Sequence, residues 1–312
     1  MSTEILSNKI IEYAKSLGFD NIGFAKVVPL TEVADKLEQW LNLGFHGNMS
    51  YMENHFEKRT NPAELVPGAK TIISLSYNYF NPEKPSDPEA PKVARYAYGR
   101  DYHKVVKKRL KDLFAYIQAE VGEVQGRYFV DSAPVMEREW ATRAGLGWQG
   151  KNTLLITPSQ GSFFFLAEII LDLDLTPSNA IKDHCGTCTR CIHACPTNAI
   201  SEKGYLLDGS KCISYLTIEL RDEIPEEFQG KMENWVFGCD ICQDVCPWNR
   251  FSKKHNEPDF EPQEGLLQLS KNDWQDLSEE SYQHLLARTP VNRTKFEGLK
   301  RNIAFASKIV KH

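Results

Sequence analysis

Four stretches of the chain carry apolar residues at helical spacing. Residues 4–17 place apolar side chains among charged ones every three to four positions, and Gly18 follows as a stop signal. The same pattern predicts a helix over residues 31–43 and a basic helix over residues 102–121. A further helical region is expected over residues 267–312, where leucine and tryptophan side chains are available to pack.

Short runs of β-branched and aromatic residues lie between these helices. They predict strands over residues 21–28, 71–77 and 127–130, and a buried hairpin or strand pair formed by residues 154–156 and 163–171. Because helix and strand alternate up to about residue 175, the N-terminal half is predicted to be an α/β domain.

The amino-acid composition of the sequence changes after about residue 180. Cysteine, proline and short helices dominate up to about residue 250, which is typical of a domain organised by metal rather than by apolar burial. We therefore expect three parts: an α/β domain over residues 1–175, a metal-organised domain over residues 176–252, and a helical segment over residues 253–312.

Composition fits an ordinary globular protein. The 312 residues are 41% hydrophobic and 25% charged, which is enough for one large domain and a smaller one. No run approaches the roughly 20 apolar residues that a membrane span requires, and the N-terminus carries no basic and apolar export signal. We therefore expect a cytoplasmic monomer without a membrane partner.

Charge restricts the possible contacts with nucleic acid. The formal net charge of −5 argues against binding through the whole surface. Two local basic groups remain, one over residues 103–111 and one formed by Arg293, Lys295, Lys300 and Arg301. Solvated helix faces are the commoner explanation of such groups, and a nucleic-acid contact is the alternative.

The eight cysteines follow the spacing of bacterial ferredoxins. The first run comprises Cys185, Cys188, Cys191 and Cys195, separated by two, two and three residues and followed by a proline. The last three members of a second run are Cys239, Cys242 and Cys246, again before a proline, and the lone Cys212 supplies the missing first member. Together they predict two iron–sulfur clusters, most simply two cubane [4Fe–4S] clusters.

In two-cluster ferredoxins the fourth cysteine of one run ligates the other cluster. On that analogy one cluster is held by Cys185, Cys188, Cys191 and Cys246, and the other by Cys195, Cys212, Cys239 and Cys242. Structural zinc is the weaker alternative, because zinc sites do not use this order of spacings. Disulfides are unexpected in a chain without an export signal. Two clusters in series move single electrons, so another part of the chain must receive them.

The segment over residues 130–152 is the candidate site that uses these electrons. Asp131 directly follows a predicted strand, where α/β domains place functional side chains. Gly145, Gly147 and Gly150 would permit close approach of the backbone to a bulky ligand. Their spacing formally matches a dinucleotide motif, but no strand leads into it. Ordinary structural roles also fit, with Asp131 as a helix cap and Glu137 paired with its neighbour on the surface.

The chain resembles the epoxyqueuosine reductase family over about residues 5–305. The resemblance is carried by residues 58–59, 67–70, 95–103, 130–152, 212–219 and 238–249. It implies a nitroreductase-like, mixed α/β cobalamin-binding domain joined to a ferredoxin-like domain with two [4Fe–4S] clusters. The implied activity is the last step of queuosine synthesis, in which epoxyqueuosine at the wobble position of a tRNA anticodon stem-loop loses its epoxide oxygen.

The same resemblance assigns roles to individual residues. It implies that Asp131 is the proton donor above the corrin, and a general acid of this kind is expected to be sheltered so that its pKa is raised. The implied cobalamin (B12) contacts are Lys58, Arg59, Arg95, Tyr98, Asp101, Tyr102, His103, Lys151, Asn152, Asp240 and Gln243. We expect His103 to bind a corrin side chain rather than cobalt, because a strong axial ligand would hinder the cob(I) state.

The resemblance also implies partners. The basic groups become candidates for tRNA phosphates, and Trp148, Tyr215 and Trp248 become candidates for base stacking, with core or cluster-shielding roles as the alternative. The clusters require a low-potential electron donor that the sequence does not identify. Many members of the family continue into a HEAT-like helical domain that helps to grip tRNA. This sequence stops at His312, which leaves the mode of tRNA binding open.

Two other functions compete with this interpretation. One is a small-molecule corrinoid reductase of the dehalogenase type, although exported dehalogenases usually carry a twin-arginine signal, which is absent here. The other is an electron-transfer protein of the ferredoxin kind, fused to a structural domain. The second alternative leaves Asp131 and the glycine-rich segment without a role, and a failure to bind cobalamin would favour it.

Overall fold

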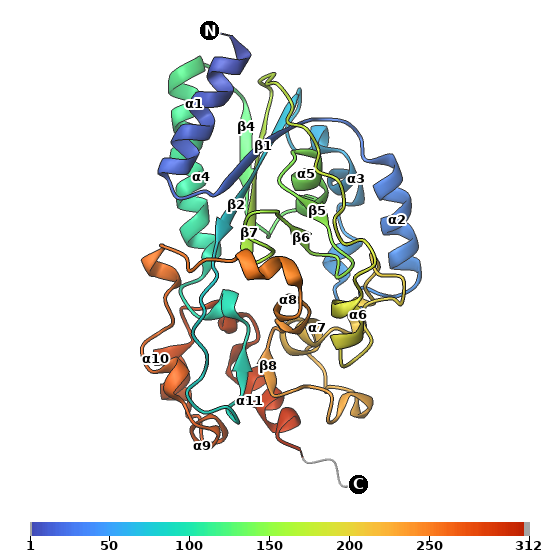
Figure 1. The fold of residues 1–312 in the computed structure, drawn as a ribbon, viewed down its shortest axis with the longest axis vertical. Helices are drawn as coiled ribbons and strands as arrows, with labels where there is room; N and C mark the ends of the chain where they lie inside the picture. Colours follow the sequence, from blue (N-terminus) through green and yellow to red (C-terminus); the bar gives the residue numbers. More distant parts are fainter. Residues whose placement is uncertain (1, 309–312) are drawn as a thin grey trace.

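A four-stranded antiparallel sheet forms the centre of the N-terminal part (Figure 1). The computed structural model describes residues 2–308. The strands of this sheet are β1 (Asn21–Lys26), β2 (Thr71–Asn78), β4 (Gly126–Phe129) and β7 (Phe164–Leu171). Their order is β1-β2-β7-β4, and each neighbouring pair runs antiparallel. β2 and β7 lie at the centre because their nearly continuous apolar sequences require burial on both faces.

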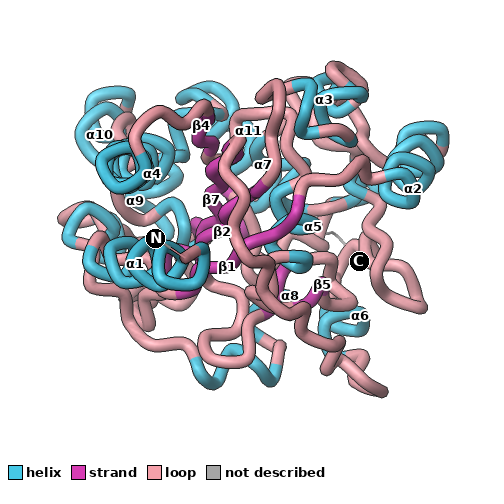
Figure 2. The backbone as a smooth tube through the Cα atoms, turned by 90° about the horizontal axis from the view of Figure 1, so that it is seen from above, coloured by secondary structure: helices cyan, strands magenta, loops and turns pink. Residues whose placement is uncertain are grey.

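Helices cover both faces of the sheet, and Figure 2 shows the three layers from above. One face is covered by α1 (Thr3–Ser16) and α4 (Tyr102–Val121), and the other by α2 (Thr31–Asn42), α3 (Phe56–Thr60) and α5 (Glu137–Arg143). Successive residues of a strand point to opposite faces. Ile73 and Ile169 accordingly join the core under α4, whereas Ile72 and Ile170 join the core under α5.

A second body lies beyond one end of the sheet and has its own core (Figure 1). Its short strands β3 (Lys92–Val93) and β8 (Trp235–Phe237) pair in parallel. Its helices are α6 (Arg190–Ala194), α7 (Ile213–Ile218), α8 (Ile241–Asp244), α9 (Lys271–Gln275), α10 (Glu279–Leu285) and α11 (Lys295–Ala306). Residues 90–98 pack here against α11, although they lie between strands of the main sheet in the sequence.

The structure confirms the helices predicted over residues 4–17, 31–43 and 102–121, with ends shifted by at most one residue. The C-terminal helical prediction is confirmed for α9, α10 and α11, and residues 309–312 lie outside the described part. None of the helices in residues 2–308 is both long enough and apolar enough to cross a membrane.

One expectation about the strands was wrong. Residues 154–156 and 163–171 do not form a hairpin: β6 (Leu155–Ile156) pairs with β5 (Trp148–Gln149), and β7 pairs with β2 and β4. The long apolar run of β7 is buried best between two neighbours, which a hairpin partner of two residues cannot provide. The sheet is antiparallel and helices cover both of its faces, so the domain has the mixed α/β character that the resemblance implied.

Candidate functional site

Four thiols from two distant segments line one cavity of about 250 Å³. They belong to Cys185, Cys188, Cys191 and Cys246, which is the first set predicted from the ferredoxin spacing. Cys191 lies in α6, and Cys246 lies two residues after the end of α8. The packing of α6 against α8 therefore brings the two segments together. Ligation of a cluster by these thiols stays a prediction.

The other four thiols lie deeper in the second body. Burial raises the pKa of the Cys242 thiol, and the neighbouring thiols of Cys212, Cys191 and Cys195 raise it further. Burial likewise raises the pKa of Cys239, with further contributions from Cys212 and Cys242. Cys195, Cys212 and Cys239 thus each lie near Cys242, as the predicted second set requires. The proximity of Cys191 to Cys242 also places the two sets side by side.

The arrangement suits clusters better than single ions. No three His, Cys, Asp or Glu side chains within residues 2–308 form a group that could hold one metal ion. A cubane cluster does not need such a group, because each of its four thiolates binds a different iron atom. All eight cysteines are free and half-buried in the structure. The residues present therefore fit two [4Fe–4S] clusters.

Lys151 and Asn152 line the first thiol cavity. The Lys151 ammonium donates hydrogen bonds to the carbonyl oxygens of Gly186 (2.7 Å) and Cys188 (3.0 Å). It therefore braces the loop that carries Cys185 and Cys188, and its contact with a corrin stays a prediction. Asn152 is buried beside it and its Nδ2 has no protein partner.

Two glycines before Lys151 allow other segments of the protein backbone to approach closely. A side chain at Gly147 would meet the carbonyl oxygen of Ile156 at 2.0 Å, and one at Gly145 would meet the carbonyl oxygen of Asn179 at 2.2 Å. Gly145 also has a φ of +74°, which favours glycine. The expectation that these glycines admit a bulky ligand was wrong at these two positions, because the approaching group is the protein's own backbone.

Asp131 stands at the centre of a polar cluster. Its carboxylate accepts a hydrogen bond from the Tyr102 hydroxyl (2.6 Å) and lies 3.2 Å from Nε2 of His103. Nδ1 of His103 lies 2.7 Å from Asp101. Tyr102 is held in place because its ring stacks on Phe165 of β7, with centroids 4.0 Å apart. The structure thus brings together four residues that the sequence singled out, Asp101, Tyr102, His103 and Asp131.

The hydrogen bonds of this cluster favour a protonated His103. Burial alone would lower the pKa of His103, but its hydrogen bonds to Asp101 and Asp131 raise that pKa to about 9. Burial alone would raise the pKa of Asp131, but hydrogen bonds from His103 and Tyr102 hold it below its usual range. The expectation of a raised pKa for Asp131 was therefore wrong for this state. The Asp131 side chain is 59% exposed and well supplied with donors, so the carboxylate is favoured.

Sequence reasoning missed a buried carboxyl pair beside Asp131. Glu137, the first residue of α5, accepts a hydrogen bond of 2.6 Å from the backbone N–H of Asp131. Glu168 of β7 is fully buried, and burial first, then the neighbouring Glu137 carboxyl, raise its pKa. A surface pair of Glu137 and Arg138 was the structural alternative, but Arg138 donates to the carbonyl oxygen of Thr153. The available signal was a glutamate inside the apolar sequence of β7.

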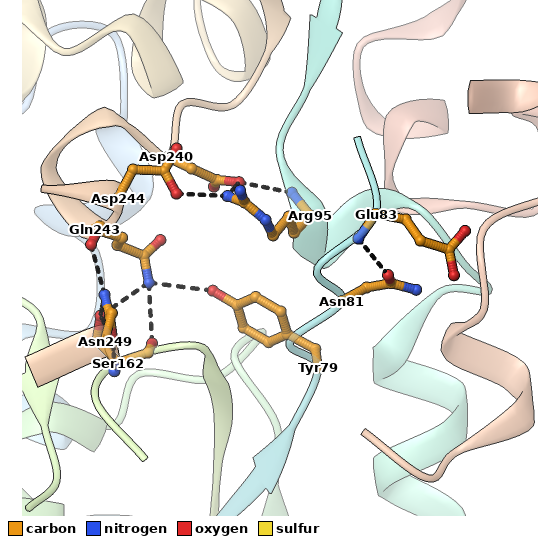
Figure 3. A network of polar contacts seen from close by, with 9 residues as sticks. All are labelled: Tyr79, Asn81, Glu83, Arg95, Ser162, Asp240, Gln243, Asp244 and Asn249. Atoms are coloured by element: carbon orange, nitrogen blue, oxygen red, sulfur yellow. Dashed lines mark hydrogen bonds and ion pairs between the residues drawn. The ribbon is translucent and has the colours of Figure 1, made fainter. Parts of the chain in front are cut away.

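Three further predicted corrin contacts make hydrogen bonds within the protein (Figure 3), and their contact with a corrin stays a prediction. The Arg95 guanidinium donates to Asp240 (2.9 Å) and Asp244 (2.8 Å). The Gln243 amide donates to the carbonyl oxygen of Ser162 (3.0 Å). Burial raises the pKa of Asp240 to about 6, against the opposing effect of Arg95. Arg95, Asp240 and Gln243 therefore fasten α8, with its cysteine, to the chain near β2 and β7.

Replacing Arg95 with alanine is expected to lower the free energy of unfolding by about 3–5 kcal/mol, because the buried Asp240 carboxylate loses its partner. Denaturant unfolding of the iron-loaded protein measures the change. Arg100→Ala is the matched control, since its ion pair with Asp259 is exposed and is worth less than about 1 kcal/mol. Equal losses in both variants would contradict the role assigned to Arg95.

The remaining predicted corrin contacts and the predicted stacking residues lie at several other positions in the fold. Arg59 is buried and donates to the carbonyl oxygen of Tyr51 (2.6 Å), Lys58 is exposed, and Tyr98 packs in the second core. Of the stacking candidates, Trp148 and Tyr215 are buried, and Trp248 lines the first thiol cavity. Trp148 packs edge-on against Trp248 with centroids 4.9 Å apart. Trp148 and Trp248 therefore shield the first thiol set, while the Tyr215 hydroxyl accepts a hydrogen bond from the Asn48 backbone N–H.

The C-terminal basic group is largely engaged within the protein. Arg293 binds both carboxylate oxygens of Glu219 (2.7 and 2.8 Å). Arg301 donates to the carbonyl oxygens of Leu216 and Leu220. By contrast, the lysines of α4 project from the face opposite its buried side and are exposed: Lys104, Lys107, Lys108 and Lys111.

Comparisons with known proteins give a consistent result. Residues 59–132 match the family model described as epoxyqueuosine reductase QueG, DUF1730, and residues 184–249 match a 4Fe-4S double cluster binding domain. An epoxyqueuosine reductase from Leadbetterella byssophila is 56% identical, over 97% of this chain and 99% of the relative. One from Pseudomonas aeruginosa is 44% identical, over 96% of this chain and 84% of the relative.

Solved structures agree with these sequence matches. A crystal structure of selenomethionine-labelled epoxyqueuosine reductase superposes with a TM-score of 0.89 at 30% identity, covering 98% of this chain and 82% of the other. An epoxyqueuosine reductase solved with an epoxyqueuosine-modified tRNA-Tyr stem loop superposes with a TM-score of 0.86 at 31% identity, covering 98% and 81%.

Proposed function

Because this chain belongs to the epoxyqueuosine reductase family, we propose that it reduces epoxyqueuosine to queuosine in the anticodon stem-loop of tRNA. The observation that carries this function is 56% identity to an epoxyqueuosine reductase over nearly the full length of both chains. The two thiol sets and the cluster around Asp131 supply the two kinds of chemistry that the reaction needs, electron delivery and proton delivery.

The residues near Asp131 also fit a large polar cofactor. The pKa of Tyr51 is raised by burial and by Glu219 and Asp131, and lowered by Arg293. Tyr51 and Arg293, which come from different bodies, therefore lie near the exposed Asp131 side chain. Polar and charged groups of this kind suit the amide side chains of a corrin. Bound cob(I)alamin would supply the strong reductant that opens the epoxide.

Protons come from the protein. Removal of the epoxide oxygen as water consumes two electrons and two protons. Asp131 is the proposed donor to the oxygen, and His103 holds the proton that Asp131 passes on. A ligand that covers Asp131 would remove its solvent contact and raise its pKa, which moves the proton from the imidazole to the carboxylate. Tyr102 keeps the carboxylate pointed into the space.

Electrons are proposed to enter through the cluster of Cys185, Cys188, Cys191 and Cys246. A groove of about 930 Å³ borders Cys246 and is lined by Lys84, Arg190 and Arg250. The acidic side chain in this lining, Asp244, is already paired with Arg95. The groove therefore suits a small acidic protein that carries single electrons, which we take as the low-potential donor.

Reversing two of these charges tests the entry site. Arg190→Glu together with Arg250→Glu is expected to slow reduction of the clusters by an acidic flavodoxin about 10-fold at low salt, because steering is lost. Reduction by dithionite should stay unchanged. Stopped-flow absorbance of the clusters measures both rates, and Lys15→Glu on α1 is the control. Equal slowing with dithionite, or no slowing with flavodoxin, would place electron entry elsewhere.

The proposed function also assigns contacts with tRNA and a role to each part of the chain. The exposed lysines of α4 are assigned to phosphates, because this helix begins beside Asp131. Residues 1–175 would bind cobalamin and the reacting base, residues 176–252 the clusters, and the segment from residue 253 would support both. The chain would act as a monomer in the cytoplasm, where its tRNA substrate is found.

An anaerobic assay of the reconstituted protein tests the function. Cobalamin, a strong reductant and tRNA bearing epoxyqueuosine are supplied, and the nucleosides are identified by mass spectrometry. Loss of one oxygen mass that depends on cobalamin supports the proposal. Bound cobalamin and intact clusters without conversion would favour a small-molecule corrinoid reductase. Failure to bind cobalamin would leave an electron-transfer protein.

A further inference from the structure

Three carboxyl groups follow one another from the solvent-exposed space into the sheet. Asp131 lies in the loop after β4, Glu137 begins α5, and Glu168 lies on the central strand β7. The backbone N–H of Asp131 donates to Glu137 at 2.6 Å. Asp131 has a φ of +56°, so this hydrogen bond holds the loop in an uncommon conformation. Glu137 thereby connects the exposed carboxylate to the buried one.

Glu168 is an unusual residue for its position. It is 0% exposed, and neither carboxylate oxygen has a hydrogen-bond donor among the other described residues. Its neighbours across the sheet are Ser74 of β2 and Phe129 of β4. A buried carboxyl without donors is neutral in a protein interior. The Glu137 carboxyl can accept its acid proton.

The two glutamates have different proton affinities. Burial first, and then the charge of Glu137, raise the pKa of Glu168 well above its usual value. Burial first, and then the charge of Asp131, raise the pKa of Glu137 to about 7. The hydrogen bond from Glu168 and the charge of Arg138 act in the opposite direction on Glu137. Glu168 therefore stays protonated, while Glu137 gains and loses its proton near neutrality.

The stoichiometry of the proposed reaction suggests a role for Glu137 and Glu168 in proton delivery. Two protons are consumed for each epoxide oxygen that leaves as water. The imidazolium of His103, which faces Asp101 and Asp131, supplies one of them. Asp131 can pass on a second proton only if another donor reprotonates it, and the substrate covers the solvent side at that moment. Arg293, which also acts on Asp131, has no proton to release near neutral pH.

We propose that Glu137 delivers the second proton of each turnover to Asp131, and that Glu168 beneath it is a positioning residue that keeps Glu137 ready to release that proton. The O–H bond of Glu137 breaks and an O–H bond forms on Asp131, directly after rotation of the side chains or through one water molecule. No electron moves in this step. Solvent protonates Glu137 again once the product has left. This inference rests on the proposed function, since it assigns Asp131 the role of donor.

The substitution Glu137→Gln separates proton delivery from structure. Glutamine keeps an acceptor for the Asp131 N–H but carries no acid proton. Turnover is expected to fall by about 10- to 100-fold, and the change in rate near pH 7 should disappear, while iron content and cobalamin binding are kept. Glu123→Gln, at an exposed position, is the matched control. Wild-type turnover with an unchanged pH profile in Glu137→Gln would overturn the proposal.

A conservative pair of variants tests Glu168. Glu168→Gln still donates a hydrogen bond to Glu137, whereas Glu168→Leu does not. Loss of that hydrogen bond raises the pKa of Glu137, so the pH profile of Glu168→Leu should shift to higher pH, and that of Glu168→Gln should stay near the wild-type position. A merely structural role would lower the rate of Glu168→Leu without moving its profile, and that result would overturn the role of Glu168.

Infrared spectroscopy gives a readout that needs neither cofactor nor substrate. The protein as purified should show a protonated carboxyl band that persists above neutral pH and is missing in Glu168→Gln. A second band should titrate near pH 7 and be missing in Glu137→Gln. If the wild type shows both bands but no turnover, the proposed function is disproved and the protonation of the carboxyl pair still stands. If the wild type shows no band that titrates near pH 7, or if that band remains in Glu137→Gln, the inference itself is overturned.

Stability against pH checks the burial of the Glu168 proton. The folded pKa of Glu168 is raised above its unfolded value, so its contribution to stability is fully present below about pH 4.5 and is lost as pH rises toward the folded pKa. Glu168→Gln removes this dependence. We expect the variant to gain thermal stability over the wild type as pH rises from 5 to 8. An unchanged difference across that range would show that Glu168 is ionised when folded.

Discussion

Asp131→Asn is expected to lower turnover on epoxyqueuosine-containing tRNA by about 100-fold or more, the range in which a positioned general acid contributes. The substitution is a fair test because it leaves the geometry intact. Asparagine tolerates the left-handed conformation that Asp131 adopts, with a φ of +56°. Its side-chain oxygen can still accept the hydrogen bonds from Tyr102 and His103. What it lacks is the ability to hold and release a proton.

Measurements on the same samples keep this result interpretable. Iron content and the absorbance of bound cobalamin should match the wild type, so that lost turnover is assigned to proton transfer. Tyr102→Phe is the companion variant, since it removes one donor to Asp131 but no proton carrier, and its loss should be smaller. If Asp131→Asn turns over at the wild-type rate, the proton donor is another group, and His103 becomes the first candidate.

Paired cysteine substitutions should separate the two clusters. Cys185→Ala with Cys246→Ala removes two thiols of the same predicted set, so about four of about eight irons should remain. Cys185→Ala with Cys195→Ala removes one thiol from each set, and most of the iron should be lost. Alanine is chosen because it offers no oxygen ligand. Turnover should disappear in both variants, because the clusters are expected to pass electrons in series.

Iron analysis and electron paramagnetic resonance of the reduced proteins distinguish these outcomes. A variant that keeps one cluster shows one reduced signal, and the wild type shows two interacting clusters. The Leu206→Ala variant, at an exposed position between the two cysteine runs, controls for general damage to this region. Equal iron loss in the two double variants would disprove the crossed assignment of Cys195 and Cys246.

The sequence predicted local chemistry better than long-range contacts. The cysteine sets follow from spacings of two and three residues, and the structure places each set together. Asp131 was found because a strand ends just before it. The helix over residues 102–121 was evident from its periodicity, which also placed Tyr102 and His103 at its start. In each case the decisive information lies within a few residues.

The contacts that the sequence did not reveal join segments far apart in the chain. Arg95 meets Asp240 across 145 residues, and Lys151 meets the carbonyl oxygen of Cys188 across 37. Nothing in the local pattern says whether a basic side chain binds a cofactor, an acid or a carbonyl oxygen. The role of Glu168 depends on register, because β7 aims it at α5 rather than at solvent. Its presence in an apolar strand was the one local sign.

The pairing of β3 with β8 imposes an order on synthesis. Residues 92–98 leave the ribosome long before β8 and α11, which complete their core. Until then, Arg95 has no carboxylate partner and the apolar side chains around it have no cover. The second body can therefore close only when almost the whole chain has emerged, and its many non-local contacts predict slow folding. This delay leaves the cysteine runs accessible, so iron–sulfur assembly factors would act on a nascent or newly released chain.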